Sequence, residues 1–550
     1  MHIKKHPAVR GASILARPSA LTARILCAAA LAAAAMPAAA QQTPAPKPAG
    51  LLPAPISPQP PSLTPADIDN AVGQLDGIVA RTMEETGIPG VAVAVVYGDE
   101  VVYEKAFGVR EAGKPEPIDT DTVFLVASVS KPIASTVVAG LVGEGVFAFD
   151  DPVIGYNPDF ALSDPYVTQN ATFADLLSHR TGISTGAGDF LGDLGFDRTT
   201  ILGRLDAHSL DAFRSTSHYS NLGYTAGGEA AAIAAGRPFA DVADDVLFEP
   251  LGMTRTSYRE HDYLAHANRA SIHRPAAPGA TTWEPTQPPP LEAAAPAGGA
   301  SSTIADMAKF MRLHLAQGAF DGRQVIDPAA LATTQLPHAI TSPPRFAARP
   351  GGYGLGWAVE IDDDGRVVYG HSGAFNLGTS TNVTLLPGED LGITVLTNGA
   401  PIGVPESIAT TFMDIARNGR QTVDWAALFQ NGFMQMRAAE IADAEALMPT
   451  GDPGTARPLE AYTGTYDNSY YGPATLTIDG GMLVLSLGPE DAPVSLPLTH
   501  REGDRFTFET IREWATGTAV AQFAGTAGDK AATVTLSAYD MDDLGTFVRP

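Results

Sequence analysis

The sequence predicts an α+β protein: an antiparallel sheet flanked by helices, with a helical lobe beside it, followed by a small all-β barrel-like domain. Three observations carry this prediction. Residues 91–97 and 100–108 read as a β-hairpin turned at Gly98 and Asp99. Strand-like runs return only about 250 residues later, after a stretch of helix and loop patterns, so the two groups of strands are expected to pair in one sheet. After residue 459 the pattern changes to short alternating strands.

The chain begins with a segment typical of a signal peptide. Basic residues precede the apolar run ILCAAALAAAAM, and small residues follow it up to Ala40. The apolar run has about a dozen residues, short of the ~20 that span a bilayer, so we expect cleavage after Ala40 rather than a retained anchor. The mature protein would then be periplasmic or secreted, with no stable insertion into the membrane.

Composition excludes several kinds of site and partner. The only cysteine, Cys27, lies within residues 1–40, so the mature chain could form no disulfide and use no thiolate. No histidine pair has metal-ligand spacing with a carboxylate, so we expect no metal and no cofactor. The net charge is −26, and residues 1–40 hold five basic and no acidic residues, so their loss would make it −31. Nucleic acid is a poor partner for so acidic a chain, and the oligomeric state stays open.

Five segments are expected in chain order. They are a signal peptide at 1–40, a proline-rich linker at 41–63, a domain of sheet and helices at 64–422, a helix and linker at 423–458, and a β-barrel-like domain at 459–550. Thr64 and Pro65 suit the N-cap and first position of a helix, which predicts an amphipathic helix from there to Met83. Further runs predict three strands and one long helix, at 366–370, 382–388, 391–398 and 423–448.

The stretch VASVSKPIAS, residues 126–135, puts Lys131 three places after Ser128 at the start of an apolar helix. Residues three apart share a helical face, so Ser128 Oγ and Lys131 Nζ would lie side by side. Burial lowers the pKa of a lysine toward a value at which its neutral amine can accept the serine proton. The pattern therefore predicts a serine nucleophile with a lysine base. The alternative is a helix start with a surface lysine.

Two later motifs could complete such a site. HYSNLGY places Tyr219 and Asn221 two apart in a turn. There the phenol can carry a proton, and the amide can bind a substrate carbonyl or the lysine. GHSGA ends a strand, where the backbone N–H of Ala374, with that of Ser128, could form an oxyanion hole. Gly373 would let the substrate backbone approach closely.

In this order and in these settings, the three motifs resemble those of the serine β-lactamase and penicillin-binding protein superfamily. The likeness is greatest to its class C-like branch, with esterases, D-aminopeptidases and D-alanyl-D-alanine carboxypeptidases, and covers about residues 64–420. It implies a β-lactamase-like fold, with Ser128 as the acylated nucleophile and Lys131 as its base or proton relay. It also implies that Tyr219 assists proton transfer to the leaving group and that Asn221 positions the substrate.

The strands opened by LEAYTGTYDN, residues 459–468, are similar to lipocalin-like β-domains appended to some members of this superfamily. In some relatives such a domain helps to close the active site. Here the domain could do the same, or it could be a passive stability module.

One position departs from the β-lactamase pattern. His371 stands where those enzymes have the lysine of K-T-G, and this form is similar to that of many esterase and peptidase relatives. His371 could bind substrate when protonated, or it could be structural and bond the strand end to its neighbour. The resemblance implies hydrolysis of small esters or D-amino-acid-containing peptides, with β-lactams ranked behind. The alternatives are a β-lactamase, or a non-turnover penicillin-recognising binding or sensor protein.

A rival interpretation makes GHSGA a nucleophile elbow in which Ser372 attacks. That motif requires glycine at position 374, where this chain has alanine. It also requires a catalytic histidine downstream, where only His500 exists, so the sequence favours Ser128. His179, in LLSHRTG, is expected to pack or to form hydrogen bonds rather than to catalyse.

Overall fold

A computed structural model describes residues 62–341, 351–446, 448, 454–515 and 517–550. The predicted signal peptide, nearly all of the proline-rich linker and residues 449–453 of the second linker lie outside this part of the chain. Within the described ranges, no helix is long and apolar enough to cross a membrane.

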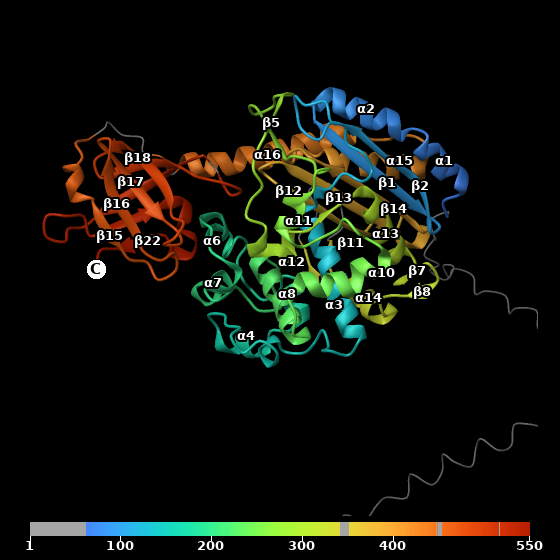
Figure 1. Ribbon diagram of the computed structural model, residues 1–550, viewed down its shortest axis with the longest axis horizontal. Helices are drawn as coiled ribbons and strands as arrows, with labels where there is room; N and C mark the ends of the chain where they lie inside the picture. The colour runs from blue at the N-terminus through green and yellow to red at the C-terminus, as the bar shows by residue number, and fades with distance from the viewer. Residues whose placement is uncertain (1–61, 342–350, 447, 449–453, 516) are drawn as a thin grey trace, which may run out of the picture. The chain divides into compact units, whose positions relative to one another are not determined.

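An eight-stranded antiparallel sheet forms the centre of the first domain (Figure 1). The order of its strands is β2-β1-β14-β13-β12-β11-β10-β9. The strands are β1 Gly90–Tyr97, β2 Glu100–Gly108, β9 Ala339–Ile340, β10 Gly352–Tyr353, β11 Ala358–Ile361, β12 Val367–Phe375, β13 Thr379–Leu386 and β14 Leu391–Thr397. Strand β1 pairs with β2 on one side and with β14 on the other. The prediction that distant strands join in one sheet is therefore confirmed.

Strand β1 separates two cores because its side chains alternate between the two faces of the sheet. Its odd-numbered residues, such as Val93, pack with helices α1, α2 and α15. Its even-numbered residues, such as Ala94, belong to the core of the other face, which includes helices α3 and α13. These helices are α1 Pro65–Val72, α2 Leu75–Thr86, α3 Ser130–Gly143, α13 Ile304–Leu315 and α15 Val404–Asn418. A strand covered on both faces explains the nearly continuous apolar run of β1.

The first helical segment differs from the predicted single helix between Thr64 and Met83. Thr64 caps α1 with a full capping box, as expected, but α1 ends at Val72 and α2 begins at Leu75. Gly73 lies at the break, and glycine is costly inside a helix because the unfolded chain has so much freedom to lose there. The apolar periodicity continues across the turn, which is why it indicated one helix where there are two.

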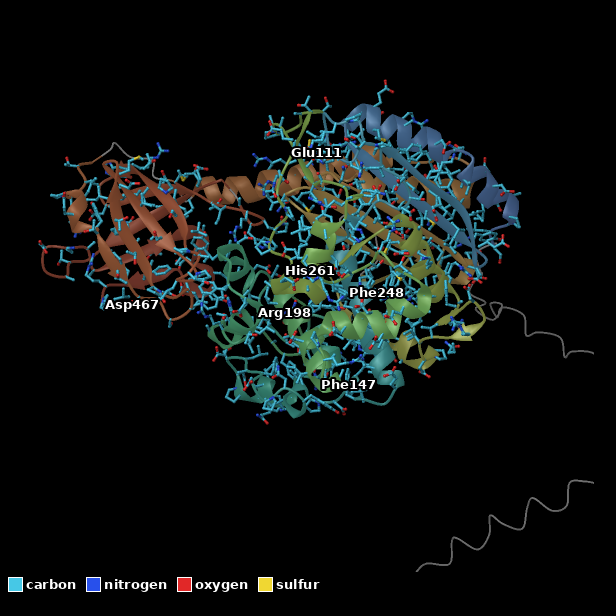
Figure 2. The ribbon with its side chains drawn as sticks, in the orientation of Figure 1. Glu111, Phe147, Arg198, Phe248, His261 and Asp467 are labelled. Carbon is cyan, nitrogen blue, oxygen red and sulfur yellow. The ribbon has the colours of Figure 1, made fainter. Side chains whose placement is uncertain are left out.

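The chain between β2 and β9 forms the helical lobe. Its other helices are α4 Pro165–Asn170, α5 Phe173–Leu177, α6 Asp189–Leu194, α7 Arg198–Leu202, α8 Asn221–Ala235, α9 Phe239–Ala243, α10 Glu249–Leu251, α11 Glu260–Ala265, α12 Ala295–Gly298 and α14 Pro328–Thr334. Aromatic side chains pack in its interior. Phe147, labelled in Figure 2, is one of them. Its ring stacks on that of Phe173 with 4.0 Å between ring centroids. Helix α3 contacts α8, α12 and α14, and most of its residues are buried. Side chains at the start of α3 therefore lie inside the protein.

Three short strand pairs complete the lobe. They are β3 Phe124–Leu125 with β6 Ser301–Ser302, β4 His273–Pro275 with β5 Trp283–Pro285, and β7 Ala319–Phe320 with β8 Arg323–Gln324. Strand β3 lies directly before the turn that leads into α3.

The second domain is an antiparallel sheet of eight strands in chain order, which confirms the predicted barrel-like domain. The strands are β15 Gly464–Tyr466, β16 Ala474–Asp479, β17 Met482–Leu487, β18 Val494–Glu502, β19 Arg505–Glu509, β20 Thr518–Ala524, β21 Thr533–Leu536 and β22 Thr546–Val548. A bridge between Asp467 and Val548 joins the first and last strands and nearly closes the barrel. The long helix expected at 423–448 is present as α16 Trp425–Ala446.

Candidate active site

Ser128 lies in a short 3-10 turn, Ala127–Val129, that leads directly into α3, and Lys131 is the second residue of that helix. Ala127 has a φ of 47°, a left-handed conformation that an alanine adopts only at a cost. The surrounding structure must therefore hold this turn in place. Lys131 Nζ lies 3.1 Å from Ser128 Oγ, so the structure brings the serine and lysine together.

The polar contacts of Lys131 fit a neutral amine. Nζ lies 2.8 Å from Asn221 Oδ1, 3.0 Å from the carbonyl oxygen of Ala297 and 3.1 Å from Ser128 Oγ. The amide oxygen and the carbonyl oxygen can only accept hydrogen bonds. A neutral amine has two hydrogens, so it can donate one to each acceptor and keep its lone pair for the hydroxyl proton of Ser128.

The pKa values separate the base from the proton carrier. Burial lowers the pKa of Lys131 to about 7, although the Asp189 carboxyl group opposes this shift. With such a pKa, about half of the lysine is neutral at pH 7. Desolvation beside the pocket raises the pKa of the Tyr219 phenol, while a hydrogen bond with Ser128 acts in the opposite direction. Tyr219 therefore keeps its proton at neutral pH, and Lys131 is the group that can accept one.

Asn221 is fixed by its position at the first turn of α8. Ser220 caps this helix, and its Oγ accepts the N–H of Gly223. Asn221 Nδ2 lies 3.4 and 3.5 Å from the two carboxyl oxygens of Asp189. A carboxylate attracts the NH₂ end of the amide, so the Oδ1 end is turned toward Lys131.

A group of rings supports Tyr219 from behind. The ring centroids of His179, His371 and Tyr353 lie 4.6, 6.1 and 6.4 Å from that of Tyr219. His179 Nδ1 accepts the backbone N–H of Ser220. These contacts give His179 the packing and hydrogen-bonding role that the sequence indicated.

His371 is buried in β12 and is not among the residues that line the pocket beside Ser128. Its partners place the ring proton on Nδ1, which donates to the carbonyl oxygen of Ser372 at 2.6 Å, while Nε2 accepts from the Tyr353 hydroxyl at 2.9 Å. Burial lowers the pKa of His371 to about 3, and the charge of Lys131 adds to this shift. The ring is neutral at physiological pH, which favours the structural alternative for this histidine.

Strand β12 passes so close to Ser128 that only glycine fits at position 373. A Cβ on Gly373 would lie 2.2 Å from the carbonyl oxygen of Val126 and 2.9 Å from Ser128 N. The pairing of β11 with β12 extends only as far as Gly370. The last residues of β12 are therefore available to a ligand, and Ala374 lines the pocket beside Ser128.

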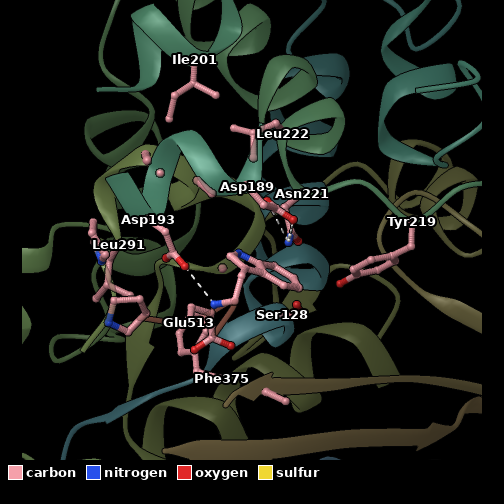
Figure 3. Close-up of a pocket in the computed structure, with 18 of the residues that line it drawn as sticks. Ser128, Asp189, Asp193, Ile201, Tyr219, Asn221, Leu222, Leu291, Phe375 and Glu513 are labelled. Atoms are coloured by element: carbon pink, nitrogen blue, oxygen red, sulfur yellow. Dashed lines mark hydrogen bonds between the residues drawn. The ribbon is translucent and has the colours of Figure 1, made fainter. Parts of the chain in front are cut away.

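A pocket of about 290 Å³ opens beside Ser128 (Figure 3). Ser128, Tyr219, Asn221 and Ala374 line this cavity, so the structure brings these four predicted site residues together there. The other three predicted site residues, Lys131, His371 and Gly373, do not line it. Much of the remaining wall is apolar, with side chains of Ile201, Leu222, Leu291, Phe375 and Trp514. The volume suits a small substrate or one end of a larger one.

Four carboxyl groups at the pocket were not predicted. They belong to Asp189, Asp193, Glu406 and Glu513. Asp189 ends the glycine-rich turn GAGD, in which Gly186 and Gly188 both have positive φ, and this turn was the available sequence signal. Glu513 belongs to the second domain, where no motif marks it.

Ser372 also lines the pocket, but no described histidine is placed to act as its base. Its Oγ accepts a hydrogen bond from Asn382 Nδ2. Both ring nitrogens of His371 have other partners, and His500 bonds to the backbone of Gly503. The geometry therefore favours Ser128 over the elbow interpretation.

Known proteins match both parts of the chain. Residues 75–417 match the family model described as Beta-lactamase, and residues 449–546 match a domain of unknown function, DUF3471. Penicillin-binding protein 4 of Amycolatopsis lactamdurans is 32% identical over 341 residues, which are 60% of this chain and 84% of that protein. Esterase EstB of Burkholderia gladioli is 31% identical over 207 residues, 34% of this chain and 51% of that one. The octameric penicillin-binding protein homologue from Pyrococcus abyssi shares the fold, with a TM-score of 0.56 at 19% identity over 87% of this chain and 100% of that chain.

Proposed function

This chain belongs to the beta-lactamase family, and we propose that it is a serine hydrolase that forms an acyl-enzyme on Ser128 and hydrolyses small esters or D-amino-acid-containing peptides. The observation that carries the proposal is the position of the Lys131 amine, between Ser128 Oγ and two groups that only accept hydrogen bonds. The names of the relatives, an esterase and a penicillin-binding protein, support the reaction class.

In the proposed acylation, Ser128 Oγ attacks the carbonyl carbon of the substrate, and its proton passes to the neutral amine of Lys131. The backbone N–H groups of Ser128 and Ala374 stabilise the oxyanion that forms. The proton then passes through Tyr219 to the leaving group as the C–O or C–N bond breaks. The acyl group remains on Ser128 as an ester, and the leaving group departs as an alcohol or amine.

In the proposed deacylation, a water molecule attacks the carbonyl carbon of this ester and gives a proton to Lys131. The Ser128 oxygen leaves and takes a proton back, so a free carboxylic acid is released and the enzyme returns to its starting state. The same lysine thus serves as base for both half-reactions, which requires that it be neutral at the start of each.

The charge around the site supports ranking β-lactams behind esters and peptides. A β-lactam carries a carboxylate that a positively charged side chain would have to bind. His371 stands at the position of the β-lactamase lysine, and burial lowers its pKa to about 3, so it carries no charge at neutral pH. We also propose that the enzyme acts after export, because residues 1–40 have the pattern of a cleaved signal peptide.

A three-substrate comparison tests the proposed function. The enzyme is incubated with a p-nitrophenyl ester, a D-alanyl peptide and a chromogenic cephalosporin, and kcat/KM is measured for each. We expect turnover of the ester or the peptide, with the cephalosporin slower than the better of the two. A cephalosporin rate far above both others would show a β-lactamase. Release of one equivalent of product without further turnover would show a binding or sensor protein.

The Tyr219→Phe variant is expected to lower kcat by about 100-fold, because it removes the hydroxyl that carries the proton to the leaving group. The effect should be smaller for p-nitrophenyl esters, whose leaving group needs no proton, than for peptides. Steady-state kinetics with both substrates measures this difference. Tyr166→Phe, at an exposed tyrosine in α4, is the matched control. An unchanged peptide rate in Tyr219→Phe would make Tyr219 a packing residue.

A further inference from the structure

The pocket beside Ser128 is acidic. Of the described residues that line it, four are aspartate or glutamate and none is lysine, arginine or histidine. Two cations lie beside the cavity without lining it: Lys131 bonds to Ser128, Asn221 and Ala297, and Arg512 donates to the backbone carbonyl oxygen of Asp193. The described residues also contain no group of three or more His, Cys, Asp or Glu side chains placed to hold a metal ion. A negatively charged substrate group would therefore meet no positive partner in this cavity.

Glu513 is fixed in the pocket by backbone groups of the first domain. Its Oε1 accepts the N–H of Asn376 at 2.7 Å, and its Oε2 accepts the N–H of Leu377 at 3.2 Å. The next residue, Trp514, donates its backbone N–H to Asp193 Oδ2 at 2.9 Å. The Glu513 residue is only 7% exposed. Its carboxyl group is thus held in one place and keeps lone pairs for a further donor.

Keeping these groups together costs the free enzyme stability. Burial raises the pKa of Asp189 to about 7, of Asp193 to about 6 and of Glu513 to about 8. A carboxyl group whose pKa is raised by folding binds protons more tightly when folded, so its contribution to stability falls as pH rises from about 4 through the raised value. A bound cation would offset this cost by pairing with the ionised groups.

Glu406 is an independent feature that suits a hydrogen-bond donor in the pocket. It lines the same pocket from the first turn of α15 and is 9% exposed. Its Oε2 has no hydrogen-bond partner among the described residues, while the Ser372 hydroxyl group interacts with the same carboxyl group. A buried carboxyl oxygen without a donor is unusual in a folded protein, and a substrate that donates a hydrogen bond would satisfy it.

The carboxyl groups lie on the acyl side of the site. Figure 3 shows Asp193 and Glu513 on one side of Ser128 and Tyr219 on the other. In the proposed reaction Tyr219 gives a proton to the leaving group, so the leaving group lies toward Tyr219. The acyl part of the substrate then points toward the carboxyl groups.

We propose that the pocket binds an ammonium group on the acyl part of the substrate, so that the preferred substrates are esters or amides of amino acids with a free amino group. This inference rests on the proposed function and narrows its substrate class. The carboxyl groups that line the cavity attract the ammonium group, and the apolar wall contacts the carbon chain. A substrate whose acyl part is neutral or anionic binds less well.

Pairs of methyl esters test this substrate class. The charged substrates are the methyl esters of β-alanine and of both enantiomers of alanine. Their partners are methyl butanoate and methyl 2-methylpropanoate, in which a methyl group replaces the ammonium group without changing the shape. We expect kcat/KM for at least one charged ester to exceed that of its partner by about tenfold or more. Equal rates within each pair, or faster neutral esters, would overturn the inference.

The Glu513→Gln variant tests whether this residue carries the preference. The ratio of kcat/KM for the charged and neutral esters should fall by about tenfold, because the variant removes a carboxyl group that can ionise and pair with the bound ammonium group. Glu509→Gln, at an exposed glutamate of the same domain, is the matched control and should keep the wild-type ratio. A ratio that stays the same in a folded Glu513→Gln variant would contradict the assignment.

A binding measurement separates this inference from the proposed function. Saturation-transfer NMR compares butylammonium chloride with sodium butanoate on the wild-type protein, and it needs no turnover. We expect binding of butylammonium that Glu513→Gln weakens and Glu509→Gln does not. Stronger binding of butanoate would refute the acidic pocket even if Ser128 proves to be the nucleophile. Binding of butylammonium with no acylation of Ser128 would keep the inference and reject the proposed mechanism.

Discussion

Replacing Ser128 with alanine is expected to lower kcat/KM for every substrate by about 10⁴-fold or more, because the variant has no atom that can take the acyl group. The substitution removes one oxygen from a partly exposed side chain in the turn before α3. The fold should therefore be kept, which thermal unfolding measured beside the kinetics will show. If Ser128→Ala loses activity because it does not fold, the assignment is tested by those of the other serine and lysine variants that do fold.

Two further serine variants complete this experiment. Ser215→Ala, at an exposed serine of the helical lobe, is the matched control and should behave as the wild type. Ser372→Ala tests the elbow interpretation. Turnover that persists in Ser128→Ala and is lost in Ser372→Ala would contradict the assignment of the nucleophile.

The Lys131→Ala variant is expected to abolish acylation near neutral pH, with an effect of about 10³-fold or more, because Ser128 loses its proton acceptor. In the wild-type enzyme, burial lowers the pKa of Lys131 to about 7. The lysine must be neutral to act as a base, so the acylation rate should rise with pH between about 6 and 8 and then level off. Stopped-flow measurement of acylation across this range, under conditions where the substrate is stable, gives the profile.

Two variants distinguish the loss of the Lys131 amine from the loss of the volume that its side chain fills. Lys131→Met keeps most of the volume of the buried side chain without the amine and should be as inactive as Lys131→Ala. Lys105→Ala removes an exposed lysine in β2 and should leave the profile unchanged. Acylation that stays fast in both Lys131 variants would show that another group takes the proton.

The sheet and the barrel could be predicted because burial leaves its pattern in each strand. Strand β1 is apolar throughout because both of its faces are covered, and β17 alternates because every second residue is buried. The break at Gly73 could not be predicted, because both helices keep one apolar period and only the cost of a glycine marks the turn. Local patterns thus identify the elements more reliably than their ends.

The site was only partly accessible from sequence. Ser128 and Lys131 are neighbours through the geometry of one helical turn, which a three-residue spacing encodes. Glu513 reaches the pocket through hydrogen bonds to the backbone of Asn376 and Leu377, and no local pattern specifies such a contact. The neutral state of His371 likewise depends on burial and on Tyr353, which lie outside its own motif.

The most direct test of the proposed mechanism is to find which residue is acylated. The protein is treated with a fluorophosphonate that reacts with activated serines, digested, and mapped by mass spectrometry. The account predicts one modified peptide, with the adduct on Ser128, and no adduct in the Lys131→Ala variant. An adduct on Ser372, or no adduct on Ser128 in the active wild-type enzyme, would contradict it.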